Sequence, residues 1–441
     1  MKLTKFILSD KAAVYSAAPI ARELPEKLAF SESGIYIGKS KGYRIPVFLD
    51  LESLINPHIS IIGTTGSGKT HLSKVLLAGY AAEKDCNIVV LDWNGEYCKT
   101  VEDIGGRICK IGDGDRISLF EAFKEVREAL HFISEQSGMD ESEQAVLYDL
   151  FLSKKSKRVS SGQISKCLDG IHKGGMRKKL GGIISLGVLE EGGIKLMSLF
   201  SGVVSIDLSA LLSYEDKAFY SKMILKGMLS GMYTSGRKDG IERILILDEA
   251  WKHIANDNDI GKFFRESRKY GFGIIATSQL VSDLRNEIIG NSACFFVFKL
   301  QNDSDILALR SADIIGDYSP AGLNRGECIL SISFKAYDKP YSAIIDVMSG
   351  NLAKVFCIRG GNMIRNISKI DLENMLRDYL EDDGRVSKVI KSVEAAGNAI
   401  DAEGLVFELK LAGLSRINIL LLLSELGIDG RLSMDIYKSS A

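Results

Sequence analysis

Residues 63–70 read Gly-Thr-Thr-Gly-Ser-Gly-Lys-Thr, directly after the apolar run Ile59–Ile62 and before a helical stretch from His71 to Glu83. This pattern, G-x-x-x-x-G-K-[ST] between a strand and a helix, is typical of a phosphate-binding loop and predicts a nucleotide-binding protein. The predicted nucleotide-binding residues are Gly63, Thr64, Thr65, Gly66, Ser67, Gly68, Lys69, Thr70 and His71, joined by Asp248 farther along the chain.

Each residue type in the loop has a physical reason to be there. Glycines let successive backbone N–H groups turn toward phosphate oxygens, where a side chain would block the approach. The helix N-terminus that follows favours negative charge. We expect Lys69 to reach the β- and γ-phosphates of ATP and the Thr70 hydroxyl to bind Mg²⁺.

Composition limits the remaining possibilities. The 441 residues are 46% hydrophobic and 26% charged, as in an ordinary globular protein, and the net charge of −1 means that any nucleic-acid surface must be local. The seven cysteines form no C-x-x-C pair, which argues against a zinc site or a disulfide framework and fits a reducing cytoplasm. We expect no transmembrane segment, because the apolar run Ile417–Leu423 is too short to cross a bilayer.

Short apolar runs recur along the chain and predict the strands of an α/β fold. Because these runs are apolar on both faces and helical stretches separate several of them, they favour a mostly parallel, doubly wound sheet covered by helices. The runs are Ile59–Ile62, Asn87–Asp92, Val203–Leu208, Ile244–Asp248, Gly273–Ser278 and Cys294–Lys299.

The same patterns predict four regions. Residues 1–55 form a small N-terminal β element, and residues 56–118 with 200–349 form the ATPase core. Residues 119–199, rich in Glu, Lys, Leu and Ala, are a helical insertion, and residues 350–441 are a helical C-terminal tail.

Hydrolysis needs a carboxylate strand besides the phosphate loop. The run Ile244–Asp248 is followed at once by a second acid, Glu249. We expect Asp248 to support the Mg²⁺ and Glu249 to polarise the attacking water, although an acidic pair after a strand can also be a solvated helix cap. Gln279 follows the strand Gly273–Ser278 and is predicted to sense the γ-phosphate.

Further candidates carry alternatives. Asp92 and Glu96 in Asp-Trp-Asn-Gly-Glu-Tyr either lie at the edge of the active site or serve the turn around Asn94-Gly95. Phosphoryl transfer often uses a cation from the next subunit. The candidates for such a cation are Arg265, Arg268 and Arg310, and exposed arginines on a helix are more often solvated.

Motif order resembles the HerA/FtsK superfamily of hexameric DNA-pumping ATPases over residues 34–347. The Asp-x-x-Gly-Glu-Tyr and Arg-Lys-aromatic-Gly-x-Gly elements are similar to those of the HerA branch and of conjugation ATPases. The matching segments, in order, are Gly63–Thr70, Leu91-Asp92 with Gly95-Glu96-Tyr97, Val204–Leu208, Leu245–Ala250, Arg268–Gly273, Thr277-Ser278-Gln279 and Asn324–Cys328.

The resemblance implies a RecA-like P-loop NTPase that assembles as a homo-oligomeric ring, a hexamer, with ATP at subunit boundaries and double-stranded DNA in the pore. By position it implies roles for Lys69, Thr70, Asp248, Glu249 and Gln279. Residues 1–55 are too few for the larger N-terminal β-barrel of typical HerA chains. The partner is therefore open between a repair nuclease and a membrane channel, and the location between free in the cytoplasm and peripheral at a membrane.

Basic residues gather in the helical insertion. They could follow DNA phosphates without reading sequence, or they could be a solvated surface. The candidate DNA-contacting residues are Lys173, Arg177, Lys178 and Lys179. In the tail, residues 414–426 favour oligomer packing over a helix-turn-helix.

These patterns favour an ATP-driven translocase of double-stranded DNA. One alternative is a type IV secretion or pilus-assembly ATPase that moves protein cargo, since acidic proteins suit the same basic patch. The other is a nucleotide-gated scaffold with little turnover, against which Glu249 and Gln279 both argue.

Overall fold

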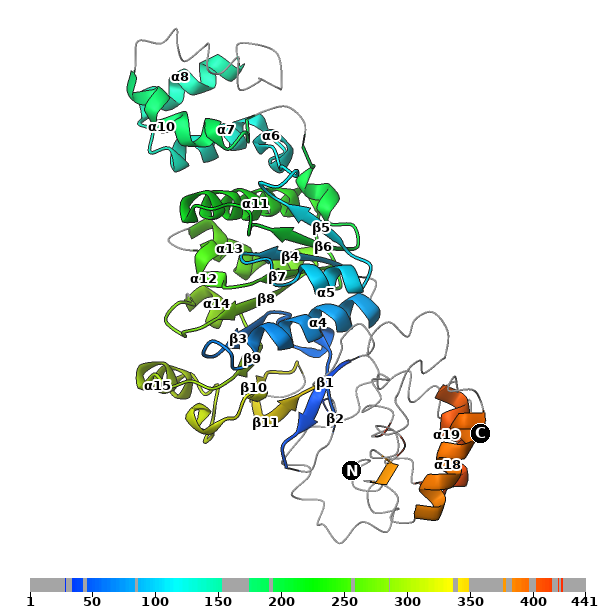
Figure 1. Ribbon diagram of the computed structural model, residues 1–441. Helices are drawn as coiled ribbons and strands as arrows, with labels where there is room; N and C mark the ends of the chain where they lie inside the picture. Colours follow the sequence, from blue (N-terminus) through cyan, green and yellow to red (C-terminus); the bar gives the residue numbers. More distant parts are fainter. Residues whose placement is uncertain are drawn as a thin grey trace. The chain divides into compact units, whose positions relative to one another are not determined.

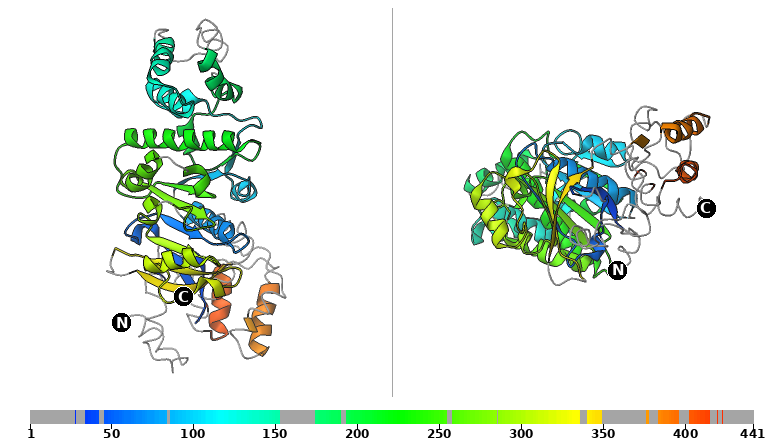
Figure 2. Two further views of the ribbon diagram at one scale, coloured as in Figure 1. Left: turned by 90° about the vertical axis from the view of Figure 1, so that its left-hand side faces the viewer. Right: turned by 90° about the horizontal axis from the view of Figure 1, so that it is seen from below.

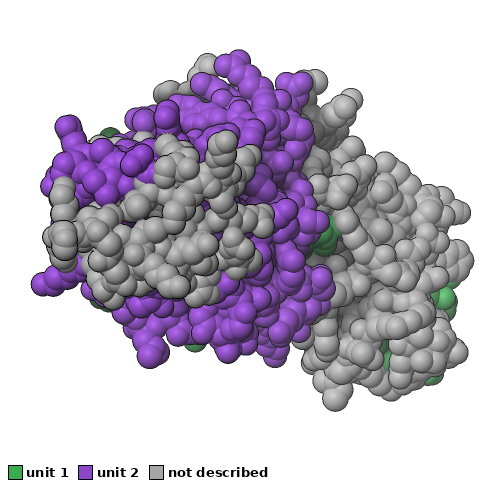
Figure 3. Space-filling model, turned by 90° about the horizontal axis from the view of Figure 1, so that it is seen from above, with its two compact units in different colours: residues 1–55, 61–85, 293–441 green, residues 56–60, 86–292 purple. Residues whose placement is uncertain are grey.

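The computed structural model divides into two compact units (Figure 3). Unit 1 consists of residues 1–55, 61–85 and 293–441, and unit 2 of residues 56–60 and 86–292. The structure describes residues 28, 34–42, 46–83, 86–152, 174–189, 193–254, 258–284, 286–335, 340–348, 376–377, 383–395, 402–414, 419 and 422.

Unit 2 is built on five parallel strands in the order β8-β7-β4-β6-β5. The first four strands in this order are mostly apolar and buried, as expected for strands with helices on both faces. The strands are β4 (Asn87–Asp92), β5 (Arg107–Lys110), β6 (Val203–Asp207), β7 (Arg243–Leu247) and β8 (Phe272–Ser278). Because they are parallel, their polar carboxyl ends meet at one edge, where Asp92 is paired in register with Asp207.

Helices cover both faces of these strands. Figure 1 shows α12, α13 and α14 on one side and α5 on the other. The long helix α11 connects β6 to β7 and packs on α12 and α13. The bounds are α5 (Cys98–Asp103), α11 (Tyr214–Ser235), α12 (Ala250–Ile254), α13 (Asn258–Glu266), η3 (Ser267–Tyr270) and α14 (Asn286–Ile289).

The predicted insertion is helical where the structure describes it. It consists of α6 (Leu119–Ala122), α7 (Val126–Gln136), α8 (Glu141–Leu152), α10 (Gly174–Ser185) and η2 (Leu196–Leu199). These elements are anchored on α11, since Phe219 packs on Phe132 of α7 with ring centroids 5.3 Å apart. On the next residue of α11, the Tyr220 hydroxyl donates to the Leu186 carbonyl at 3.4 Å.

Unit 1 has a different sheet pattern. Its strands follow the order β2-β1-β11-β10-β9-β3, and the four pairings from β2 to β9 are antiparallel. The bounds are β1 (Ile35–Ser40), β2 (Pro46–Leu49), η1 (Leu51–Ser53), β3 (Ile59–Ile62), α4 (Lys69–Glu83), β9 (Cys294–Val297), α15 (Asp303–Ser311), η4 (Pro320–Gly322), β10 (Glu327–Ile332) and β11 (Tyr341–Val347). Helix α4 packs closely on β1, because a Cβ on Gly79 would lie 2.9 Å from Ile35 Cδ1.

The predicted strands are all present, and β3 and β4 have the predicted bounds. Strands β5, β10 and β11 were not anticipated. Strand β1 pairs with β11 and β2 pairs with β1, so these two N-terminal strands extend the sheet of unit 1. Within the tail, α18 (Asp383–Ala395) and α19 (Ala402–Leu411) lie side by side (Figure 2). Most of residues 414–426 lies outside the described residues. No described helix is long and apolar enough to span a bilayer.

Pairing of β1 with β11 depends on Gly38. Its φ is +155°, and a Cβ there would lie 2.0 Å from the Asp346 carbonyl oxygen. We expect Gly38→Ala to lower the free energy of unfolding by roughly 2–3 kcal/mol through this backbone clash. Urea denaturation measures this loss in the free energy of unfolding. Gly316→Ala is the control, because Gly316 has a φ of +51° but no atom within 4 Å of the place where a Cβ would lie; an equal loss in both variants would contradict the clash.

Candidate active site

The phosphate loop lies in unit 1, between β3 and α4. Gly66, at the exposed tip, has a φ of +77°, and a Cβ on Gly68 would lie 2.9 Å from Phe298 Cε1. One glycine is therefore needed for its backbone conformation and the other for a close approach. This conformation fits a phosphate, which main-chain N–H groups can approach only where side chains are small.

The carbonyl of Thr64 organises the inside of the loop. It accepts hydrogen bonds from the Ser67 hydroxyl at 2.7 Å and from Lys69 Nζ at 3.2 Å. Thr64 itself donates its N–H to the Lys299 carbonyl at 2.9 Å, just past β9. The Lys69 residue is only 7% exposed, so its ammonium is directed across the loop and away from bulk water.

A turn before β10 supports the loop from behind. The Gly326 N–H donates to the Ser67 carbonyl at 3.0 Å, and Gly326 Cα would lie 3.6 Å from a Cβ on Gly68. Glu327 closes the turn by accepting from the Asn324 N–H at 3.0 Å and from Lys41 Nζ at 2.8 Å. Burial opposes its charge, but these donors lower the pKa of the Glu327 carboxyl. In the sequence, the segment Asn324–Cys328 was recognised only through its resemblance to the family, with no role assigned to it.

His71 makes a contact of a different kind. Its Nε2–H donates to the Met348 carbonyl at 2.7 Å, since a carbonyl can only accept. The ring thus ties α4 to the residue after β11, and its contact with nucleotide stays a prediction.

In unit 2, Asp248 follows β7 and is almost completely buried, with 3% exposed. Burial, followed by the charges of Asp92 and Glu96, raises its pKa to about 7. The carboxylate accepts a hydrogen bond from the Thr277 hydroxyl at 3.1 Å and a longer one from the Tyr97 hydroxyl at 3.4 Å. A cation beside this carboxyl would favour its ionised form.

Glu249 and Gln279, predicted as base and sensor, are in contact. Gln279 Nε2 donates to Glu249 Oε1 at 2.8 Å, which holds the carboxylate in one orientation. Thr277 joins them to Asp248, because its hydroxyl also accepts the Glu249 N–H at 2.9 Å. The sequence predicted that Thr277 lies on the strand but gave it no role. The signal that could have indicated one was a polar residue near the end of a buried strand, two positions before Gln279.

Asp92 is fully buried and serves the turn that follows it. One oxygen accepts the N–H groups of Gly95 at 2.8 Å and Glu96 at 3.1 Å, and the other accepts that of Tyr97 at 2.8 Å. Burial nevertheless raises the pKa of Asp92, even though these donors stabilise its charge. The turn brings Tyr97 and the charge of Glu96 to Asp248. The hydrogen bonds of Asp92 are those of the turn alternative, and a role at the edge of the active site stays a prediction.

The structure does not bring Arg265 or Arg268 to these carboxylates. Arg265 lies in the last turn of α13 and Arg268 in η3, before the amino end of β8, whereas Gln279 follows the carboxyl end of β8. Seven strand residues at about 3.3 Å each separate these ends by about 20 Å. Arg310 is on α15 in unit 1 and exposed.

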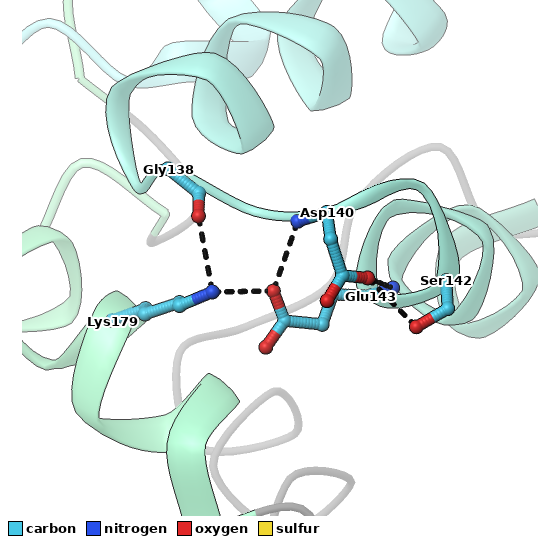
Figure 4. A network of polar contacts seen from close by, with 5 residues as sticks. All are labelled: Gly138, Asp140, Ser142, Glu143 and Lys179. Carbon is cyan, nitrogen blue, oxygen red and sulfur yellow. Dashed lines mark hydrogen bonds and ion pairs between the residues drawn. The ribbon is translucent and has the colours of Figure 1, made fainter.

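Among the basic candidates of the insertion, Lys179 is engaged within the protein (Figure 4). Its Nζ donates to Glu143 Oε2 at 2.6 Å and to the Gly138 carbonyl at 3.0 Å. The hydrogen bond from Lys179 is the main reason that the pKa of Glu143 is lowered. Lys178 is exposed; Lys173 and the side chain of Arg177 lie outside the described part of the chain.

The Thr70 hydroxyl and the Asp248 carboxylate are oxygen groups of the kind that Mg²⁺ binds. Among the described residues, no group of three or more His, Cys, Asp or Glu side chains could hold a metal ion. Mg²⁺ in nucleotide sites needs only one or two protein ligands, the rest being phosphates and water. Thr70 and Asp248 remain the predicted ligands for that role.

Comparisons with known proteins concern the sequence and the fold. The model of the helicase HerA central domain matches residues 35–179. The DNA import protein CedB of Sulfolobus acidocaldarius is 25% identical over 272 residues, covering 57% of this chain and 45% of CedB. The DNA double-strand break repair helicase HerA of Pyrococcus furiosus is 24% identical over 378 residues, covering 69% of this chain and 68% of HerA. The chain thus spans about half the length of CedB.

Solved structures confirm the α/β P-loop fold. VirB4 of Thermoanaerobacter pseudethanolicus superposes with a TM-score of 0.54 and 17% identity, over 73% of this chain and 98% of VirB4. The bacterial conjugative coupling protein TrwB, in a form called TrwBdeltaN70, superposes with a TM-score of 0.52 and 13% identity, over 74% and 92% of the two chains. At these identities the likeness concerns the fold.

The raised pKa of Asp248 predicts a pH-dependent cost in stability. The folded carboxyl has a pKa of about 7 against an ordinary value of 3.8, so the cost is absent below about pH 4, grows as the pH rises, and is complete above about pH 7. Without nucleotide or magnesium, Asp248→Asn should therefore be more stable than the wild type by about 2–4 kcal/mol at pH 8.

Thermal denaturation between pH 4.5 and 8 measures this difference. Asp113→Asn is the control, because the Asp113 side chain is exposed and its replacement removes a carboxylate that is not buried. A stability gain by Asp248→Asn that does not shrink as the pH falls would contradict the raised pKa.

Proposed function

We propose that this chain, whose sequence and fold match the HerA/FtsK superfamily, is an ATP-hydrolysing, ring-forming motor that translocates double-stranded DNA. The observation that carries the proposal is the contact of Glu249 with Gln279, joined through Thr277 to the buried Asp248. A protein that only bound nucleotide would not need a carboxylate oriented in this way.

The phosphate loop would bind the nucleotide. Lys69 and the main-chain N–H groups of the loop would hold the phosphates, and Thr70 and Asp248 would hold Mg²⁺. When bound, Mg²⁺ neutralises phosphate charge that builds up during transfer. Burial raises the pKa of Asp248 to about 7, and a cation bound beside it would favour the ionised carboxylate.

Glu249 is the proposed general base for the attacking water. Its carboxylate is held by the Gln279 amide, and its main-chain N–H by Thr277. In this proposal Gln279 reports on the γ-phosphate by changing its contact with Glu249. Orientation of this kind can contribute several orders of magnitude to a rate.

DNA as cargo is supported by the names of two relatives, and the ring is implied by the resemblance to the HerA/FtsK superfamily. CedB is described as a DNA import protein and HerA as a DNA repair helicase. We propose a hexamer, and the position of Arg265 and Arg268 at the far end of β8 supports a role for them in a neighbouring subunit's site. We place the protein in the cytoplasm, free or peripheral at a membrane, with a nuclease or a membrane channel as the open choice of partner.

Steady-state ATP hydrolysis tests the proposal, with and without linear double-stranded DNA. We expect several-fold stimulation by DNA in the wild type, and a loss of at least about 100-fold in Glu249→Gln, which cannot accept the proton that a general base removes. Turnover indifferent to DNA but raised by a protein cargo would favour a secretion motor. Nucleotide binding without turnover in either protein would overturn the motor.

Two neighbouring lysines test whether the insertion contacts DNA. Lys178 is exposed, whereas Lys179 is held by Glu143. We expect Lys178→Ala to weaken DNA binding and to reduce the salt dependence of the affinity by about one counterion. Lys179→Ala, the matched control, should mainly destabilise the contact between α8 and α10. Fluorescence anisotropy with labelled duplex DNA measures the affinity and its salt dependence in both variants. An unchanged salt slope in Lys178→Ala would show that Lys178 does not contact DNA phosphates.

A further inference from the structure

The peptide bond between Asp248 and Glu249 leads into a strained conformation. Glu249 has a φ of +52°, and Asp313 is the other non-glycine residue with a positive φ among those described. For a residue with a Cβ this left-handed conformation is unfavourable, and it persists only where neighbouring groups hold it. The groups that hold Glu249 therefore determine how the proposed base is oriented.

The N–H and the carbonyl of the Asp248–Glu249 peptide are both hydrogen-bonded to side chains of other residues. Its N–H, that of Glu249, donates to the Thr277 hydroxyl at 2.9 Å. Its carbonyl, that of Asp248, is bonded to His253 Nε2 at 2.7 Å. The peptide plane cannot rotate without breaking one of the two hydrogen bonds.

His253 is itself fixed in one tautomer. Because a carbonyl can only accept, Nε2 carries the proton, and Nδ1 must then accept from the Ser221 hydroxyl at 2.9 Å on α11. The ring is completely buried, which lowers its pKa to about 3 and keeps it neutral. Trp93 packs edge-to-face against it with centroids 5.3 Å apart, so the ring has little freedom to turn.

We propose that His253 is a positioning residue for hydrolysis. Together with Ser221 it links α11 to the Asp248–Glu249 peptide. Because His253 holds the carbonyl of this peptide and Thr277 holds its N–H, Glu249 stays in the left-handed conformation. This inference rests on the proposed function, because it assigns His253 an effect on Glu249 and no contact with nucleotide. Loss of the His253 donor should affect turnover more than nucleotide binding.

The chain offers a matched control in His58. This histidine is also completely buried, with a pKa lowered to about 3 by burial. It uses the same pattern, with Nε2–H to the Phe264 carbonyl at 3.0 Å and the Ile274 N–H to Nδ1 at 3.1 Å. His58 joins α13 to the middle of β8 and has no bond to the Asp248–Glu249 peptide, so replacing it tests the loss of a buried histidine alone.

The experiment compares His253→Leu, His253→Gln and His58→Leu with the wild type and Glu249→Gln. We expect His253→Leu to lower kcat by about 10- to 100-fold, while affinity for a non-hydrolysable ATP analogue with Mg²⁺ stays unchanged. His253→Gln should restore much of kcat, because its amide can donate to the Asp248 carbonyl. His58→Leu should lose about as much thermal stability as His253→Leu, but its kcat should stay close to that of the wild type.

Amide hydrogen exchange at Glu249 gives a readout that does not depend on turnover. His253→Leu should accelerate exchange of this amide in the nucleotide-free protein, and His58→Leu should not. The proposal would be overturned if folded His253→Leu had the kcat and the Glu249 amide exchange rate of the wild type. It would also be overturned if His253→Leu and His58→Leu lost kcat equally. If the wild type has no turnover at all, the proposed function fails, and the exchange comparison still decides whether His253 holds the peptide.

Discussion

Burial of the Asp248 carboxyl is the constraint around which the rest of the site is arranged. A carboxylate with 3% exposure at the end of an apolar strand is costly, and its raised pKa expresses that cost. The hydroxyls of Thr277 and Tyr97 are the donors that reduce it. A cation bound beside the carboxylate would reduce this cost further.

Helix α11 connects two regions that are distant in sequence. Through Ser221 and His253 it reaches the Asp248–Glu249 peptide. Its neighbouring residues Phe219 and Tyr220 contact the helical insertion. Adjacent residues on one helix are thus linked, through His253, to the Asp248–Glu249 peptide and, directly, to the helical insertion.

Local pattern predicted much of this architecture. A glycine-rich loop between an apolar strand and a helix has few other uses, and β3 and β4 begin and end at the predicted residues because their apolar runs are continuous. Strands β5 and β11 escaped prediction for a physical reason. β5 is a four-residue strand at the end of the strand order with exposed residues, and β11 alternates between buried and half-buried positions. Such short or half-exposed runs resemble loop segments in sequence.

The sequence by itself determined the chemical groups: a phosphate loop, the acid pair Asp248 and Glu249, and Gln279 after a buried strand. Those assignments depend on residues adjacent in the chain, whose order is visible in the sequence. Only the tertiary structure decided that Thr277 and His253 hold one peptide from opposite sides, that Asp92 serves its own turn, and that Lys179 is engaged by Glu143. These contacts join residues on separate elements, and which hydroxyl or imidazole reaches which carbonyl depends on how those elements pack.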